Sequence, residues 1–287
     1  MLKLREGIVE LYRKVATSIP NDVEKALKQA YENETNELAQ KSLGIMLQNI
    51  SLARTTSRPI CQDTGFPVFY VKVPPGLGHQ HIRDIIIDAT RLATRKIPLR
   101  ANAVDIVSDS NSGDNVGNHF PIIHVEETVD STLTVDLMLK GGGSENLGQI
   151  YKLPAPVDSF GEAGRVAERD LDGVRMCVLD AVLKAQGKGC PPYTIAVTVG
   201  GAKDQVTGLS KRQLLRRLHD AHPDPRIAAF EQQVFRDVNA LGIGVAGFGG
   251  ATTSIGVKVD FAHRHPASYF VDVTFSCWAH RRGRLMW

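Results

Sequence analysis

The sequence predicts a mixed α/β fold: a single domain with a helical amino-terminal part and a sheet flanked by helices. Three observations support this class. Apolar residues recur at helical spacing through residues 1–55, and after them short apolar segments alternate with amphipathic segments. No internal repeat, low-complexity tract or clear linker divides the 287 residues, of which 43% are hydrophobic, enough for a substantial core.

The amino-terminal part is expected to form three helices. Ile8, Leu11 and Val15 lie at the spacing of one helix face. The turn-forming residues 20–22 end this helix and are suited to cap the next one, and Asn36 is a fair cap for the third. A loop that contains a cysteine follows the third helix.

The rest of the chain is expected to alternate strands with helices. Leu133, Val135 and Leu137 alternate with polar residues, which is typical of a strand. Gly187 and Gly189 follow a long apolar helix and are suited to end it. The expected strands span residues 66–73, 120–126, 132–140, 194–199, 255–260 and 269–275, and the expected helices span residues 82–93, 162–186, 211–219 and 227–241.

The charge of the chain argues against two classes of partner. The 34 basic and 31 acidic residues give a net charge of +3, which indicates neither a nucleic-acid partner nor a membrane surface. The basic pairs at 211–212 and 216–217 are expected on solvated helix faces, whereas Arg281 and Arg282 are expected in a basic patch that contacts a partner or a substrate. The sequence contains no signal-peptide pattern and no apolar stretch of membrane-spanning length, so a cytoplasmic protein is expected.

Four cysteines lie far apart in the sequence, which in a cytoplasmic protein favours free thiols or metal ligands over disulfides. Cys177 lies on the apolar face of an expected helix and is interpreted as a buried structural thiol. For Cys61, Cys190 and Cys277, composition alone favours inert thiols and ligands equally. Their positions beside turns or at strand ends favour ligands. Three thiolates can hold an iron–sulfur cluster and leave one iron open as a Lewis acid, which indicates an enzyme.

Other polar residues have both a functional and an ordinary interpretation. Asp63 and its neighbour Gln62 lie beside Cys61, where a carboxyl group can transfer protons, although Asp is also a common turn residue. The run Gly141–Gly143 can bind a carboxylate through backbone amides or serve as a flexible turn. Arg100 can bind a carboxylate, and His265 can polarise a substrate, but solvated surface positions are the more common case for both.

Taken together, these motifs resemble the iron–sulfur-dependent class I fumarases and L-tartrate dehydratases, specifically their alpha subunit or amino-terminal catalytic region. The resemblance covers nearly the whole chain, with several motifs in the family's order. The segments that resemble the family are residues 59–65, 98–104, 140–146, 190–192, 241–253, 265–266 and 277–283.

The resemblance implies one alpha-type catalytic domain over residues 1–287 and a role for each matching residue. Asp63 matches a position assigned to proton transfer at an iron-bound hydroxyl group. The positions that match ligands of a [4Fe-4S] cluster are Cys61, Cys190 and Cys277. The positions that match substrate contacts are Gln62, Arg100, Gly143 and His265.

The resemblance also implies a partner. Related enzymes need a beta subunit or a carboxy-terminal domain that supplies a catalytic base, so a hetero-oligomer built on a dimer is expected. Fumarate hydration to malate is the first expectation, and L-tartrate dehydration to oxaloacetate and mesaconate hydration are alternatives. Two other classes stay open: a non-catalytic iron–sulfur electron carrier or sensor, which would need Cys177 as a fourth ligand, and a structural subunit without metal.

Overall fold

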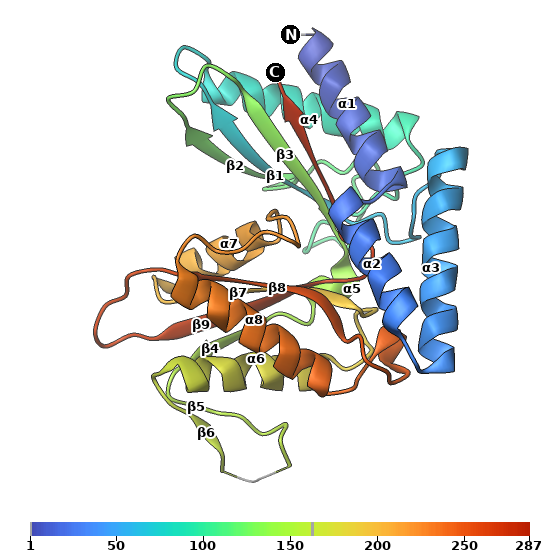
Figure 1. Cartoon of the computed structure of the whole chain (residues 1–287). Coiled ribbons are helices and arrows are strands. Elements are labelled where there is room, and N and C mark those ends of the chain that lie inside the picture. The colour runs from blue at the N-terminus through green and yellow to red at the C-terminus, as the bar shows by residue number, and fades with distance from the viewer. Residues whose placement is uncertain (1, 162–163) are drawn as a thin grey trace. The chain divides into compact units, whose positions relative to one another are not determined.

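A computed structural model describes residues 2–161 and 164–287. Its contacts divide the chain into two compact units. The first comprises Met1–Pro20, Gln48–Gly142 and Ala279–Trp287, and the second comprises Asn21–Leu47 and Gly143–Trp278. The expected mixed α/β class is confirmed, because each unit contains a mixed sheet with helices packed against it (Figure 1).

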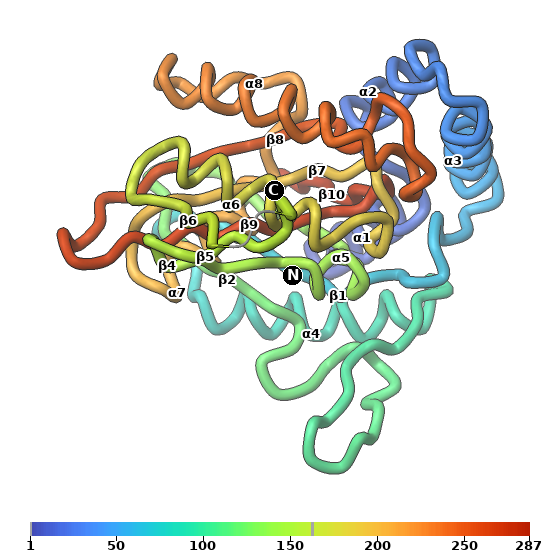
Figure 2. The backbone as a smooth tube through the Cα atoms, turned by 90° about the horizontal axis from the view of Figure 1, so that it is seen from below, coloured from blue at the N-terminus to red at the C-terminus, as the bar shows by residue number. Residues whose placement is uncertain are grey.

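A four-stranded sheet with the order β10-β3-β1-β2 forms the centre of the first unit. Its strands are β1 (Phe66–Val73), β2 (Ile122–Glu127), β3 (Thr134–Lys140) and β10 (Arg281–Met286). β1 is parallel to β2 and antiparallel to β3, and β10 is antiparallel to β3. Helices α1 (Leu2–Thr17) and α4 (His79–Lys96) cover the face on which the alternating residues Phe69, Val71 and Leu137 are buried. A long loop joins α4 to β2 (Figure 2).

A second four-stranded sheet with the order β4-β9-β7-β8 forms the centre of the second unit. Its strands are β4 (Gln149–Lys152), β7 (Tyr193–Val199), β8 (Ser254–Phe261) and β9 (Phe270–Ser276). Helices α6 (Leu171–Ala185) and α8 (Pro225–Ala240) pack with the apolar strand residues in one core. Helix α7 (Lys203–Gln213) contacts the polar residues of β9, where the hydroxyl groups of Thr207 and Ser210 donate to the carboxylate of Asp272.

The remaining elements are short or lie near the unit boundaries. They are α2 (Asn21–Asn33), α3 (Glu37–Thr56), α5 (Gly142–Glu145), the 3-10 helix η1 (Val245–Gly247), and the paired strands β5 (Ala155–Pro156) and β6 (Val166–Ala167). The three helices expected at the amino terminus are therefore confirmed as α1, α2 and α3. In the described part of the chain, no helix has the length and apolar character needed to cross a bilayer.

Two of the expected helices differ from the structure. The helix expected over 162–186 begins at Leu171, because the carboxylate of Asp170 accepts a hydrogen bond from the Gly173 amide at 2.7 Å and caps the helix there. Residues 162–163 lie outside the described residues. The helix expected over 211–219 is wrong for most of its length, because α7 ends at Gln213 and residues 214–219 form turns and a bend. Helix α7 begins instead at Lys203, where the Gln205 side chain accepts from the Ala202 amide.

Candidate functional site

The loop that contains Cys61 is fixed by two hydrogen bonds of the preceding residue, Ile60. The Ile60 amide donates to the carbonyl of Ala16 at 3.1 Å, and the Ile60 carbonyl accepts from the side chain of Asn49 at 2.7 Å. Helices α1 and α3 therefore set the position of this loop within the first unit. The Cys61 side chain is half-buried, and none of the four cysteines, all of which are described, forms a disulfide.

The carboxylate of Asp63 joins the Cys61 loop to the glycine run. Its Oδ1 atom accepts from the Gly65 amide at 2.9 Å, and its Oδ2 atom accepts from the Gly142 amide at 2.9 Å. Gly65 has a φ angle of +77°, and a Cβ atom there would lie 2.8 Å from the carbonyl carbon of Leu139, so only glycine fits. Asp63 is thus more than a turn residue, because it also fixes the start of the glycine run.

Arg100 is fixed to the same loop through its backbone. Its amide donates to the hydroxyl group of Thr64 at 3.1 Å, and its carbonyl accepts from the Asn115 side chain at 2.9 Å. The Asn115 oxygen accepts from the Asn102 amide at 2.7 Å, and the Asn102 side chain donates to the carbonyl of Gly65 at 2.8 Å. The guanidinium group of Arg100 projects from an exposed residue. A fixed backbone with an exposed cationic side chain suits the binding of an anion.

Gln62 and Gly143 are both exposed. A Cβ atom built on Gly143 would meet nothing within 4 Å, so its backbone is open to a ligand. Gln62 belongs to the first unit together with Asp63 and Arg100, whereas Gly143 is the first residue of a segment of the second unit.

Cys190 and Cys277 lie on neighbouring segments of the second unit. Cys190 precedes the start of β7, and Cys277 follows the end of β9, where Thr194 pairs with Ser276. The amide of Trp278 donates to the carbonyl of Cys190 at 3.1 Å, which holds the two cysteine segments together. Cys190 is exposed and has a φ angle of +58°, a strained conformation for a residue other than glycine.

Tyr193 orders the loop that contains Cys190. Its hydroxyl group accepts from the amide of Gly189 at 3.1 Å and donates to the carbonyl of Gln186 at 2.7 Å. Burial raises the pKa of Tyr193 to about 12, and negative charge at Cys190 and Cys277 contributes to the increase. Sequence reasoning missed Tyr193; its only signal is an aromatic residue directly after the Cys-Pro-Pro motif.

His265 lies away from Cys277 within the second unit. It is exposed in the loop that precedes β9, and its Nδ1 atom accepts from the amide of Ala267 at 3.1 Å. Cys277 follows the other end of this seven-residue strand. A strand of that length spans roughly 20 Å, so the two side chains are not brought together within this unit. The role of His265 stays a prediction.

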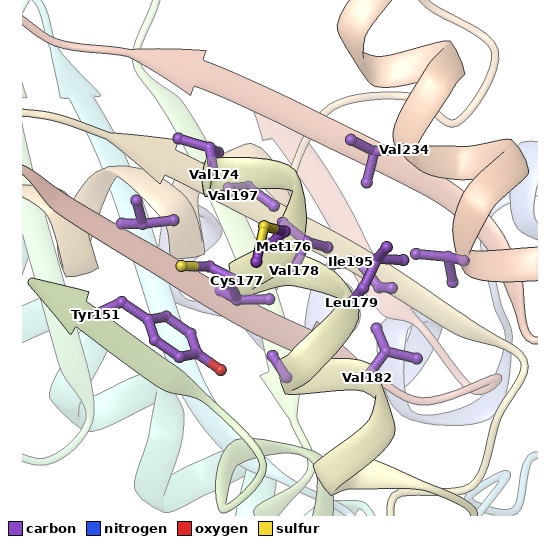
Figure 3. Packing of buried hydrophobic residues seen from close by; sticks show 14 of the residues in the cluster. Tyr151, Val174, Met176, Cys177, Val178, Leu179, Val182, Ile195, Val197 and Val234 are labelled. Carbon is purple, nitrogen blue, oxygen red and sulfur yellow. The ribbon is translucent and has the colours of Figure 1, made fainter. Parts of the chain in front are cut away.

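Cys177 is fully buried in the core of the second unit, among residues of α6 that include Val174 and Val178 (Figure 3). Burial raises the pKa of its thiol to about 12, and the negative charge of Asp180 adds to the shift. The thiol is therefore protonated at neutral pH, which makes it a poor metal ligand. The interpretation of Cys177 as a buried thiol is confirmed.

Replacing Cys177 with alanine is expected to leave the iron and sulfide content of the anaerobically reconstituted protein unchanged. The expected cost is about 1 kcal/mol of unfolding free energy, because a small apolar group is removed from a packed core. Iron and sulfide analysis beside a urea titration measures both quantities. Loss of iron in a variant that unfolds at the wild-type urea concentration would make Cys177 a ligand and favour a four-cysteine electron carrier.

One residue in each of the three basic pairs is less exposed than the sequence predicts, whereas Arg217 is exposed as expected. Lys211 forms an ion pair with Glu145, and its side chain is only 16% exposed. Arg216 forms ion pairs with Asp220 and Glu231, and its side chain is only 18% exposed. The expectation of solvated faces is therefore wrong for these residues, because tertiary contacts supply acidic partners. Arg281, expected in a basic patch, is 1% exposed.

The thiols have the chemistry that an iron–sulfur cluster requires. Thiolate is the soft ligand that iron–sulfur clusters use, and Cys61, Cys190 and Cys277 are all at least partly exposed and free of disulfides. Within the described residues, no three His, Cys, Asp or Glu side chains are grouped to hold a metal ion. The neighbouring, solvent-accessible segments of Cys190 and Cys277 fit two of the ligand positions.

Comparison with known proteins agrees with this chemistry. A family model described as "Fumarate hydratase (Fumerase)" matches residues 5–286. A Geobacillus stearothermophilus protein assigned as class I fumarate hydratase is 42% identical over 98% of this chain, and the chain spans only 54% of that protein's length. A Methanocaldococcus jannaschii protein assigned as the alpha subunit of L(+)-tartrate dehydratase is 34% identical over 98% of this chain and 96% of its own length. The L(+)-tartrate dehydratase alpha subunit of Escherichia coli (strain K12) is 32% identical over 99% of this chain and 90% of its own length.

Proposed function

The chain belongs to the fumarate hydratase (Fumerase) family, and from that premise we propose that it is the alpha-type catalytic part of an iron–sulfur-dependent hydro-lyase. The proposed reaction is the reversible addition of water to fumarate, which gives malate. The observation that carries the proposal is the carboxylate of Asp63, which two backbone amides hold between the Cys61 loop and the glycine run. A fixed carboxylate beside a thiol and open backbone suits proton transfer to a bound diacid.

Cys61, Cys190 and Cys277 are proposed to hold a [4Fe-4S] cluster, which when bound supplies a Lewis acid at the iron that lacks a cysteine ligand. The neighbouring positions of Cys190 and Cys277 support this ligand set. The short segment from Cys277 to Arg281 supports Cys61 as the third ligand. Arg281 follows Cys277 closely in the sequence, and its guanidinium group donates to the carbonyl of Asp63, which follows Cys61 closely.

The substrate is proposed to bind through its two carboxylates. Arg100 would bind one of them, since its backbone is fixed and its guanidinium group is exposed. The open backbone at Gly143 and the side chain of Gln62 would supply further hydrogen-bond donors. His265 is proposed as a substrate contact on its match to the family position alone.

Proton transfer would involve two groups, Asp63 and a base from the beta-type region. In the dehydration direction Asp63 would donate a proton to the departing hydroxyl oxygen, while a base from the beta-type region removes a proton from the neighbouring carbon. In the hydration direction the two transfers reverse. Arg100 and the backbone amide of Gly143 would stabilise the negative charge that develops on the substrate oxygens.

A second polypeptide region is proposed to complete the site. The relatives from Methanocaldococcus jannaschii and Escherichia coli are named as alpha subunits. These names support a beta partner and a hetero-oligomer built on a dimer. Fumarate is preferred as substrate because the relative assigned as a fumarate hydratase has the higher identity, at 42% against 34% and 32%. L-Tartrate dehydration to oxaloacetate and mesaconate hydration are the alternatives. The four free cysteines are consistent with a reducing compartment, and we propose the cytoplasm.

The proposal is tested by co-purifying the chain with its beta-type partner without oxygen and loading it with iron and sulfide. Hydration of fumarate, hydration of mesaconate and dehydration of L-tartrate are then measured in parallel as kcat/KM. The expected result is a kcat/KM for fumarate at least tenfold above that of the other two. A higher value for L-tartrate or mesaconate would replace the substrate, and a loaded complex that converts none of the three would reject the function.

A further inference from the structure

Arg281 carries a buried charge that has no acidic partner in the described part of the chain. It is the first residue of β10, pairs with Leu139 of β3, and is 1% exposed. Its Nη1 atom donates to the carbonyl of Asp63 at 2.8 Å, whereas its Nε atom is buried without a hydrogen-bond partner. Among residues 2–161 and 164–287, no ion pair joins Arg281 to a carboxylate.

This arrangement is unfavourable unless an anion is present. A guanidinium group stays protonated in proteins, so Arg281 cannot lose its charge on burial. A buried charge without a counter-ion is costly, and one carbonyl dipole offsets only part of that cost. The carboxylate of Asp63 is bound by the amides of Gly65 and Gly142 instead.

The position of Arg281 indicates which anion its positive charge would offset. Its guanidinium group donates to the loop that contains Cys61, and along the sequence Arg281 follows Cys277 by four residues. Three thiolates around a [4Fe-4S] core in its oxidised 2+ state carry a net negative charge. We propose that Arg281 is a positioning residue that fixes the Cys61 loop and supplies the positive charge that offsets this anionic group. The inference rests on the proposed function, because it requires the cluster.

The test compares the reduction potential of the cluster in the reconstituted complex of wild-type protein and of Arg281→Met. Removal of the positive charge should shift the potential to a more negative value, since the reduced cluster carries more negative charge. Arg281→Lys should keep a potential near that of the wild type. Arg284→Met is the matched control, because Arg284 lies on the same strand and is already paired with Asp136 at 2.7 and 2.9 Å. Its potential should be unchanged.

The outcomes separate this inference from the proposed function. An unchanged potential in loaded Arg281→Met would overturn the role of Arg281 and leave the proposed function intact. If Arg281→Met does not fold, Arg281→Gln provides a neutral, polar replacement that must show the same negative shift. Weaker binding of an unreactive dicarboxylate with an unchanged potential would pair Arg281 with the substrate and also overturn the inference. A wild-type complex that takes up no cluster would overturn both proposals.

Discussion

Replacing Cys61, Cys190 or Cys277 with serine is expected to remove most of the iron and sulfide that the wild-type complex retains after anaerobic reconstitution. A serine hydroxyl is a harder ligand than a thiol and stays protonated at neutral pH, whereas a cysteine thiol readily forms the thiolate that binds iron. Hydration of fumarate should fall to background in all three variants. Iron and sulfide per chain, visible absorbance and turnover measure these effects.

The folding of the serine variants should change little. Cys190 is exposed, and Cys61 and Cys277 are half-buried, so none of the three thiols fills a closed core position. Their unfolding transitions without metal should lie close to that of the wild type, within about 1 kcal/mol. Cys177→Ala serves as the control for loss of a cysteine. If any one of the three serine variants keeps the wild-type iron content, the proposed ligand set is wrong.

The fold class was accessible from sequence because apolar periodicity marks most of the strands and helices. β10 was not, since Arg281, Arg282 and Arg284 interrupt any alternation and Gly283 has low strand propensity. The strand forms because β3 offers an unpaired edge and Leu285 packs against the core under α1. Both causes are tertiary contacts, so the residues of β10 alone do not predict the strand.

The residues of the candidate site also fall into two groups: those that sequence motifs identify and those that only the folded structure identifies. Asp63 and Arg100 belong to recognisable motifs, and the sequence alone makes them candidates for chemistry. Asn102 and Asn115 hold the backbone of Arg100, but they act through contacts that exist only in the folded chain. The sequence predicts Arg281 in a basic patch that contacts a partner or a substrate, whereas the folded chain buries it at 1% exposure. Burial depends on tertiary packing, so the sequence around Arg281 does not predict it.

Asp63→Asn is expected to lower the turnover of the loaded complex by about 10²–10⁴-fold, the usual contribution of a general acid or base, while the iron content stays near the wild-type value. The amide cannot exchange a proton with the substrate oxygen. The substitution also has a structural effect. Both oxygens of Asp63 accept from backbone amides, of Gly65 and of Gly142, and asparagine has only one oxygen. The second amide would lose its acceptor, at a cost of about 1–3 kcal/mol.

A control is therefore needed that loosens the same loop and keeps the acid. Asn102→Ala removes the hydrogen bond to the carbonyl of Gly65 at 2.8 Å and leaves the Asp63 carboxylate in place. Turnover of this variant should fall by less than tenfold, against the much larger loss expected for Asp63→Asn. Turnover and iron content of both variants are measured side by side in the loaded complex. Equal losses in the two variants would mean that Asp63 holds the loop but does not transfer the proton.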